Sequence, residues 1–340
     1  MIHIGVISPH GLVGQYILSQ IQHIIGDQCT SMHYFTRDKR FHADCYDLNQ
    51  LQSMDIIVSL APSTYCLEVH PELRAQKWDG YWLDASSALR FKEHTCLALP
   101  PINHSAITTA LQNDIRDFSG PNCTTSLLAL GLANLLKQQV VDTINVSTYQ
   151  SLSGAGNQAI KDFQKSANQH SLHQDEATDY MNHFFKQDDQ TLGQVTPWID
   201  AEMNGGMTRE EYKMQQEITK LTGQNITLNA VCVRIPTLCT HAQTAFVTLK
   251  QPMTHKQLCN ELASTYNKII PNNKQDTLAM LAPMSVYNTP HVHIGRIRML
   301  NDHQFSCYII GDQLQWGASL PIVHTLEILL DNIKQKTASR

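Results

Sequence analysis

The sequence predicts an α/β protein with a Rossmann-like nucleotide-binding domain on a parallel sheet, followed by an α+β domain with a mostly antiparallel sheet. Up to about Ser119, short apolar segments alternate with segments of helical spacing, as in consecutive βαβ units. Beyond that point, several apolar segments are spaced like the strands of an antiparallel sheet. The 340 residues are enough for two such domains.

The composition is that of a globular protein. Hydrophobic residues make up 42% of the chain and charged residues 16%, and the net charge is −5 with neutral histidines. This balance does not favour a nucleic acid or an anionic membrane as a partner. No apolar run is long enough to span a membrane, and the start MIHIGVIS lacks the features of a signal peptide. We therefore expect a cytoplasmic protein.

Cysteine and histidine usage gives no sign of a disulfide framework or a metal centre. The 9 cysteines are scattered without a CxxC pair, which indicates free thiols in a reducing compartment. The 17 histidines include His291 and His293, but no group of them offers a full ligand set. We expect no metal site.

The first strand candidate is IHIGVIS, and a helix follows it in which Val13, Ile17, Ile21 and Ile24 recur at helical spacing. Further short strands are predicted in MHYFT, DIIVSLAP, YWLDASS and TCLALP.

The turn SPHGLVG lies where a Rossmann phosphate-binding loop belongs. The fingerprint of such a loop needs three glycines; Gly11 and Gly14 take the later positions, whereas Ser8 takes the first. An ordinary strand–helix turn explains the same residues. If the loop binds a dinucleotide, the contacting residues are Ser8, Pro9, His10, Gly11, Leu12, Val13 and Gly14.

The segment TRDKR at the end of the second strand bears on the choice of cofactor. A guanidinium at Arg37 would suit the 2′-phosphate of NADP. Asp38 leaves NAD open, and the segment is also compatible with a solvated turn. The charge argument favours NADP.

The second half begins with a predicted helix, LLALGLANLLKQQV. The half-buried strand TINVSTYQ follows, and residues 165–198 are predicted as a helix plus a long loop. A helix is predicted in TREEYKMQQEITKL, with a capping box formed by Thr208 and Glu211. The strands NAVCVRIP, TAFVTLK and FSCYII and the closing helix PIVHTLEILLDNI complete the chain.

The motif GPNCTTSLL places Cys123 at the start of a helix. A helix N-terminus stabilises a thiolate through its free N–H groups and its dipole, so a nucleophile is one interpretation. A structural cysteine is the other. The position after a nucleotide-binding half favours the nucleophile, because domain junctions form clefts.

Four more residues are candidates on chemical grounds. Arg234 lies on an apolar strand, where its charge needs a partner or an anion, and His241 follows as a possible acid/base. Each is alternatively a satisfied core or rim residue. Glu210 and Lys213 share a helix face at i, i+3, which is also compatible with a weak surface ion pair.

From end to end, the chain resembles the aspartate-β-semialdehyde dehydrogenase family, and most of all the branch typical of Gram-negative bacteria. The resemblance is carried by GLVG, WDGYWLDASSALRFK, GPNCTTSLL, STYQSLSGAG, PWIDAEMNGGMTREEYKMQQEITK, CVRIPTLCTHAQ, IGRIR and GDQLQWGASLP. Ser8 departs from the family pattern at the first loop glycine, and Pro100 stands where relatives often have an acidic residue.

The resemblance implies a role for each matching position. Cys123 corresponds to the nucleophile, His241 to the acid/base and Gln150 to the residue that orients the acyl group. Substrate-binding positions are Arg234 for the α-carboxylate, Glu210 for the amino group, Arg90 with Lys213 for the phosphate, and Asn122 beside the nucleophile. Ser153, Gly154 and Gln313 are implied as cofactor contacts, the last on the nicotinamide side.

The implied reaction is the NADPH-dependent reduction of L-aspartyl-4-phosphate to L-aspartate 4-semialdehyde through a cysteine thioester, on the route to lysine, methionine and threonine. The resemblance also implies a homodimer. Residues 1–121 would bind NADP, completed by a C-terminal helix at about 317–340, and residues 122–316 would form the catalytic and dimerisation domain. An N-acetyl-γ-glutamyl-phosphate reductase and a Cys–His hydrolase without cofactor remain as alternatives.

Overall fold

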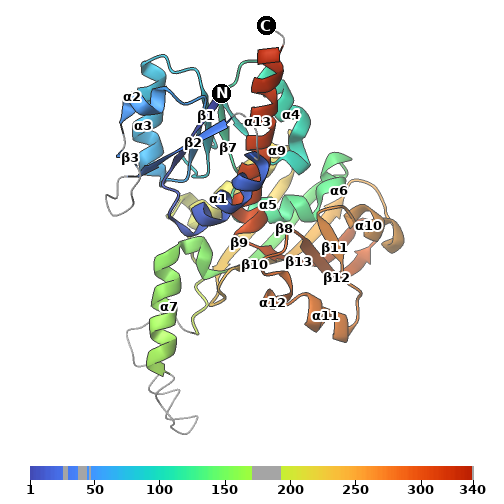
Figure 1. Cartoon of the computed structure of the whole chain (residues 1–340). Helices are drawn as coiled ribbons and strands as arrows, with labels where there is room; N and C mark the ends of the chain where they lie inside the picture. The colour runs from blue at the N-terminus through green and yellow to red at the C-terminus, as the bar shows by residue number, and fades with distance from the viewer. Residues whose placement is uncertain (26–29, 37–43, 46, 171–192, 339–340) are drawn as a thin grey trace.

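The structure is a computed structural model that describes residues 1–25, 30–36, 44–45, 47–170 and 193–338. Two sheets form its framework, one from each half of the chain, and α13 (Leu320–Ala338) returns from the second half to the first (Figure 1). Both visible chain ends lie on the side of the first sheet.

The first sheet has seven strands in the order β3-β2-β1-β4-β5-β7-β6, and all neighbouring strands are parallel. The order reverses at β1, which has β2 on one side and β4 on the other. In doubly wound folds, dinucleotides bind at the carboxyl ends of the strands beside such a switch point. The strands are β1 (Ile2–Ile7), β2 (Thr30–Thr36), β3 (Asp44–Cys45), β4 (Ile56–Ser59), β5 (Tyr81–Asp84), β6 (Thr95–Leu97) and β7 (Asp117–Ser119).

Helices cover both faces of this sheet, which explains why β4 and β5 are buried along their whole length. On one face Ile17, Ile107 and Leu326 join a core with strand residues, and on the other Leu51 and Val69 do so. The helices are α1 (Leu12–Ile25), α4 (Pro100–Gln112) and α13 on the first face, and α2 (Leu48–Gln52) and α3 (Ser63–Ala75) on the second.

The second sheet has six strands in the order β11-β12-β13-β10-β8-β9. The pairings β12/β13, β13/β10 and β10/β8 are antiparallel, whereas β8/β9 and β11/β12 are parallel. The strands are β8 (Val141–Gln150), β9 (Thr227–Arg234), β10 (Thr240–Leu249), β11 (Asn267–Ile269), β12 (Val292–Asn301) and β13 (Gln304–Asp312).

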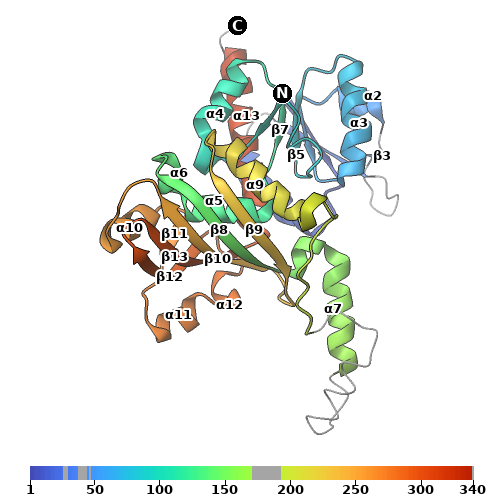
Figure 2. The same ribbon diagram turned by 180° about the vertical axis from the view of Figure 1, so that it is seen from behind.

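One face of the second sheet packs against four helices around a large apolar core, which includes Leu127, Leu135, Met214 and Leu258. These helices are α5 (Cys123–Gly131), α6 (Ala133–Lys137), α9 (Arg209–Thr222) and α10 (His255–Leu262). Helix α7 (Asn157–His170) projects away from both sheets (Figures 1 and 2). The remaining elements are α11 (Lys274–Met280), α12 (Pro283–Val286), η1 (Leu152–Ala155), η2 (Asn204–Gly206) and η3 (Gln315–Ser319).

The predicted fold class is confirmed, and the differences are local. The single helix predicted for LLALGLANLLKQQV is two helices, because the backbone leaves helical geometry at Leu132 (φ −110°, ψ 16°). The predicted capping box of Thr208 and Glu211 is present. The helix expected within 165–198 begins earlier, at Asn157, and residues 171–192 of that prediction lie outside the described part of the chain.

Within the described ranges, none of the helices combines the length and the apolar character needed to cross a membrane.

Candidate active site

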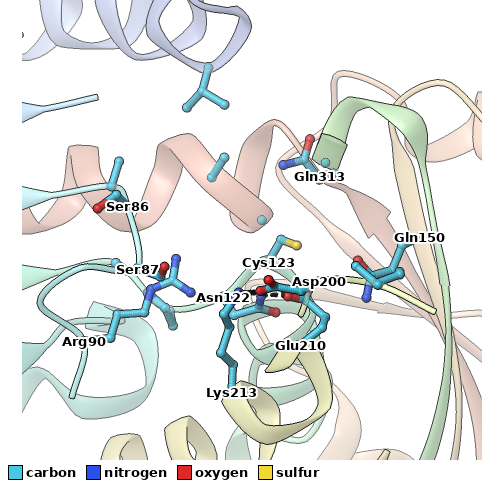
Figure 3. A pocket seen from close by; sticks show the side chains of 18 of the residues that line it. Ser86, Ser87, Arg90, Asn122, Cys123, Gln150, Asp200, Glu210, Lys213 and Gln313 are labelled. Atoms are coloured by element: carbon cyan, nitrogen blue, oxygen red, sulfur yellow. Dashed lines mark hydrogen bonds and ion pairs between the residues drawn. The ribbon is translucent and has the colours of Figure 1, made fainter. Parts of the chain in front are cut away.

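A cavity of about 480 Å³ lies where the two halves of the chain meet. Its lining includes residues that follow β4 and β5, the start of α5, the end of β8, the first turn of α9 and the start of α13. Figure 3 shows Cys123 near the centre, with Arg90 on one side and Gln150 on the other. The charged lining residues are Arg90, Asp200, Glu210, Lys213 and Arg234.

Cys123 is the first residue of α5, directly after a side-chain cap. The Asn122 side-chain oxygen accepts hydrogen bonds from the backbone N–H of Thr124 at 2.9 Å and of Thr125 at 3.4 Å. A cap of this kind fixes the direction in which the chain enters the helix. The thiol is therefore held at a defined place at the positive end of the helix dipole.

His241, in β10, places its Nε2 atom 3.2 Å from the Cys123 sulfur. Its Nδ1 atom lies 3.0 Å from the backbone nitrogen of Ser151, which donates to it. A ring nitrogen that accepts a hydrogen bond carries no proton, so the neutral ring has its proton on Nε2. His241 therefore faces the sulfur as a hydrogen-bond donor.

The surroundings of this pair favour the uncharged forms of the thiol and of the imidazole. Burial, together with the negative charge of Glu210, raises the pKa of the Cys123 thiol to about 12, while Arg234 and Arg90 act in the opposite direction. Burial and the nearby Arg234 charge lower the pKa of His241 to about 3. The thiol thus depends on nearby positive charge to become a thiolate.

A network of acidic and basic side chains lies beside the cysteine. Lys213 contacts Asp200 at 2.5 Å and Glu210 at 3.3 Å, and the Asn122 amide donates to Glu210 at 2.9 Å. The ion pair of Glu210 with Lys213 that the sequence allowed is present, but the two residues are only 5% and 8% exposed, so the pair is buried and not at the surface. The Lys213 ammonium keeps the pKa of Asp200 below its ordinary value despite the partial burial that raises it.

Arg90 enters the cavity from the segment between β5 and β6. Its Nη1 atom donates to Glu217 at 3.0 Å. Its Nε atom is buried without a hydrogen-bond partner in the described part of the protein. A buried donor of this kind is costly unless a ligand accepts from it. The guanidinium is thus suited to an anion in the cavity.

Arg234 and Gln150 are the final residues of two paired parallel strands, β9 and β8. Arg234 donates from Nη1 to the backbone oxygen of Ser151 at 2.6 Å, and burial lowers the pKa of its guanidinium. Gln150 is buried and donates to the Thr148 hydroxyl at 3.2 Å. Gly154 lies against both Arg234 and His241, where an added Cβ would come within 3.0 Å of the guanidinium.

The turn from Ser8 to Gly14 connects β1 to α1 and is tight at two positions. Ser8, in the place of the first glycine, adopts φ 57°, a left-handed conformation that normally favours glycine. A Cβ on Gly14 would lie 2.2 Å from the Pro9 carbonyl oxygen, whereas a Cβ on Gly11 would meet no atom within 4 Å. Gly11 thus leaves open space beside the start of α1, where a dinucleotide-binding fold places its diphosphate.

Not every predicted cofactor residue reaches the cavity. Within the loop, Val13 lines it, while Gly11 is exposed. Gln313 also lines the cavity and accepts a hydrogen bond from the Ser153 hydroxyl at 2.7 Å. Arg37 lies outside the described residues.

Three residues at the site were missed from the sequence. Asp200 adopts φ 72°, and no sequence pattern indicates such a conformation at an aspartate. Ser151 acts through its backbone N–H, which any residue type supplies. Glu217 could have been found, because it follows Glu210 and Lys213 at helical spacing on the same buried face.

For metals, no group of three His, Cys, Asp or Glu side chains suited to an ion is present within the described ranges.

A doubly wound, dinucleotide-type half joined to a second half that supplies a cysteine–histidine pair fits the class of oxidoreductases that use a dinucleotide cofactor. Comparisons with known proteins agree with this class. Residues 4–110 match the family described as "Semialdehyde dehydrogenase, NAD binding domain", and residues 132–316 match "Semialdehyde dehydrogenase, dimerisation domain".

Solved structures narrow the class further. The chain is 33% identical to the aspartate semialdehyde dehydrogenase from Francisella tularensis, with a TM-score of 0.92 over 97% of this chain and all of that one. The fold also matches aspartate semialdehyde dehydrogenase II from Vibrio cholerae, solved with ASA (22% identity, TM-score 0.78, 97% and 98% coverage). The enzyme from Candida albicans, solved with NADP, has the same fold (14% identity, TM-score 0.67, 98% and 99% coverage). The chain belongs to the aspartate-semialdehyde dehydrogenase family.

Proposed function

We propose that the protein reduces L-aspartyl-4-phosphate to L-aspartate 4-semialdehyde and phosphate with NADPH, through a thioester on Cys123. The observation that carries the proposal is the 3.2 Å contact of Cys123 with His241 in a cavity that has cationic groups on both sides. A carboxylate derivative accepts a hydride far better as a thioester, so covalent catalysis divides a difficult reduction into two steps.

In the first step, the Cys123 sulfur bonds to the acyl carbon and the bond from that carbon to the phosphate oxygen breaks. The phosphate leaves with the electron pair and takes up the thiol proton. Arg90 and Arg234 favour the thiolate, because both positive charges lower the pKa of the Cys123 thiol. The Nε2–H group of His241 is placed to donate to the sulfur.

In the second step, a bound nicotinamide cofactor would supply the hydride for reduction of the thioester carbonyl. As the carbon–sulfur bond breaks, negative charge returns to Cys123 beside the His241 donor, and the semialdehyde is released. Gln150 lines the cavity close to the reacting atoms and is proposed to orient the acyl group. Gln313, held by Ser153, is proposed to contact the nicotinamide.

Different charged residues are proposed to bind the two ends of the substrate, the phosphate and the amino-acid group. Arg90 and Lys213 are proposed to bind the phosphate, because both line the cavity and Arg90 Nε has no hydrogen-bond partner in the part of the chain that the structure describes. Arg234 is proposed to bind the α-carboxylate in a two-pronged contact. Glu210 is proposed to bind the ammonium, because its carboxylate has lone pairs left beyond the contacts with Asn122 and Lys213.

NADP is the proposed cofactor. The support is the Arg37 position in TRDKR and the NADP present in the Candida albicans structure. The turn Ser8–Gly14 is proposed to bind the diphosphate. Arg37→Ala should weaken the binding of NADPH far more than that of NADH, measured by fluorescence titration. Equal losses for both cofactors would remove Arg37 from this role.

One assay separates this function from its alternatives. Phosphate-dependent reduction of NADP is measured with aspartate semialdehyde and with N-acetylglutamate semialdehyde, using wild-type protein and Cys123→Ser. We expect activity with the first substrate only, since Glu210 needs a free ammonium, and none in the variant. Preference for the acetylated substrate would favour the N-acetylglutamyl-phosphate reductase, and cofactor-free hydrolysis would favour the hydrolase.

A further inference from the structure

Glu217, on α9, is a buried carboxylate with two partners in the active site. It is 0% exposed. Its Oε1 atom accepts from Arg90 Nη1 at 3.0 Å, and its Oε2 atom accepts from the backbone N–H of Asn122 at 2.5 Å. Both partners belong to the candidate active site: Arg90 lines the cavity, and Asn122 caps the helix that begins with Cys123.

Burying a carboxylate is expensive unless charges and donors compensate for the lost water. Burial raises the pKa of Glu217, whereas Arg90 and the Asn122 N–H favour its ionised form. Removing Glu217 would in turn leave Arg90 without its ion-pair partner and would leave the Asn122 N–H buried and unsatisfied. The three groups therefore hold one another in place.

The three groups also come from separate parts of the chain. Arg90 belongs to the segment between β5 and β6, Asn122 to the junction before α5, and Glu217 to the third turn of α9. One carboxylate thus links a cation of the cavity to the backbone beside the nucleophile.

We propose that Glu217 is a positioning residue, which acts through Arg90 and Asn122 without touching the substrate. It turns the Arg90 guanidinium so that its remaining N–H groups face the phosphate, and it fixes the backbone that carries Cys123. This inference rests on the proposed function, because it assumes that Arg90 binds phosphate.

Glu217→Gln tests the role with little change in shape. A carboxylate offers one oxygen to each donor, whereas the amide has a single oxygen and an NH₂ group that would face the other donor. One of the two contacts must therefore be lost. Steady-state rates of semialdehyde oxidation are measured with phosphate and semialdehyde varied separately. We expect the KM for phosphate to rise by about tenfold or more and the KM for semialdehyde by less than about twofold.

Glu211→Gln is the matched control. Glu211 lies on the same helix and also accepts from two backbone N–H groups, of Thr208 at 2.8 Å and Cys232 at 3.0 Å, but it does not line the cavity. We expect this variant to lose thermal stability without a change in either KM. A phosphate effect of equal size in both variants would assign Glu217 a purely structural role.

A double-variant cycle tests whether Glu217 acts through Arg90. Glu217→Gln should add little to the phosphate KM of Arg90→Ala, since the group that it positions is already missing. Multiplied effects would overturn the inference. Glu217→Asp keeps both oxygens and should fall between wild type and Glu217→Gln. If neither Glu217 variant folds, the residue serves the fold and the inference is wrong.

The proposed function and the role of Glu217 are tested by different results. It is refuted if the wild-type protein shows no phosphate-dependent oxidation of aspartate semialdehyde. An active wild-type enzyme whose phosphate KM does not respond to Glu217→Gln would refute only the role of Glu217.

Discussion

At the scale of single residues, three cationic side chains of the described part of the protein line the cavity, at different places. Arg90 is paired with a buried acid, and its Nε atom has no hydrogen-bond partner among the described residues. Arg234 ends a strand and donates to a backbone oxygen. Lys213 adds a point charge that is shared between Asp200 and Glu210. The arrangement explains why the three cations are not interchangeable: each is oriented by a different kind of partner.

Substitutions of these cations should affect the kinetics of phosphate and of semialdehyde differently, because the cations are proposed to bind different ends of the substrate. Arg90→Ala should raise the KM for inorganic phosphate in the oxidative direction. Arg234→Lys keeps the charge but loses the two-pronged contact, so it should act on the semialdehyde. We expect each to cost about 2–4 kcal/mol in transition-state stabilisation, measured as kcat/KM with each substrate varied. An exchange of the two effects would reverse the assignment of the ends.

Glu210 should restrain the reactivity of the free thiol. Its negative charge is the second cause, after burial, of the raised pKa of Cys123. Glu210→Gln should lower that pKa, so alkylation of Cys123 by iodoacetamide should become faster at neutral pH while turnover of the semialdehyde falls. The rate–pH profile of alkylation should shift to lower pH. A shift to higher pH would mean that the loss of hydrogen bonds to Asn122 outweighs the charge effect.

At the scale of elements, the turn between β1 and α1 contains two glycines with different roles. One is required by the packing of the turn, and the other leaves space that a ligand can occupy. Gly14 has no room for a Cβ beside Pro9, whereas Gly11 has open space around it. We expect Gly14→Ala to lower both the melting temperature and the affinity for NADPH. Gly11→Ala should leave the melting temperature unchanged and weaken only NADPH, because its methyl group would occupy space proposed for the diphosphate. Unchanged NADPH affinity in Gly11→Ala would place the cofactor elsewhere.

The elements also show where sequence patterns carry information and where they do not. Glu210, Lys213 and Glu217 follow one another at helical spacing, so their place on one face of a helix could be predicted from the sequence. The break at Leu132 could not be, because the chain stays apolar and mostly buried on both sides of it, so no change in the sequence pattern marks it. Strand β12 was missed since register shifts interrupt its pairing with β13 and Arg296, at φ 55°, disturbs the alternation.

At the scale of the whole molecule, the site depends on contacts that no local pattern contains. The register of β8 with β9 brings Gln150 opposite Arg234, across a connection of more than seventy residues that includes α7 and α9. The family resemblance predicted the identity of these residues. Their mutual geometry, such as the Ser151 N–H that sets the tautomer of His241, required the folded chain.

The second sheet offers a surface for the proposed homodimer. Helices α5, α6, α9 and α10 cover one of its faces. On the other face, α11 and α12 pack over Ala242 and Ile310, whereas Val231 in β9 and Phe246 in β10 are 53% and 44% exposed. These side chains lie on strands separated only by β8, within the region that matches the dimerisation domain. Apolar side chains on an open sheet face are the usual core of an obligate interface.

A charge on this face should therefore prevent association. We expect Val231→Asp to convert the dimer into a monomer in sedimentation experiments, since dimer formation would bury the new carboxylate without a partner. Leu67→Asp is the control, because Leu67 is 51% exposed on α3, in the other half of the molecule. The Val231→Asp monomer should still bind NADPH, because the first sheet has its own core. A dimer that persists in Val231→Asp but dissociates in Leu67→Asp would move the interface to the nucleotide-binding half.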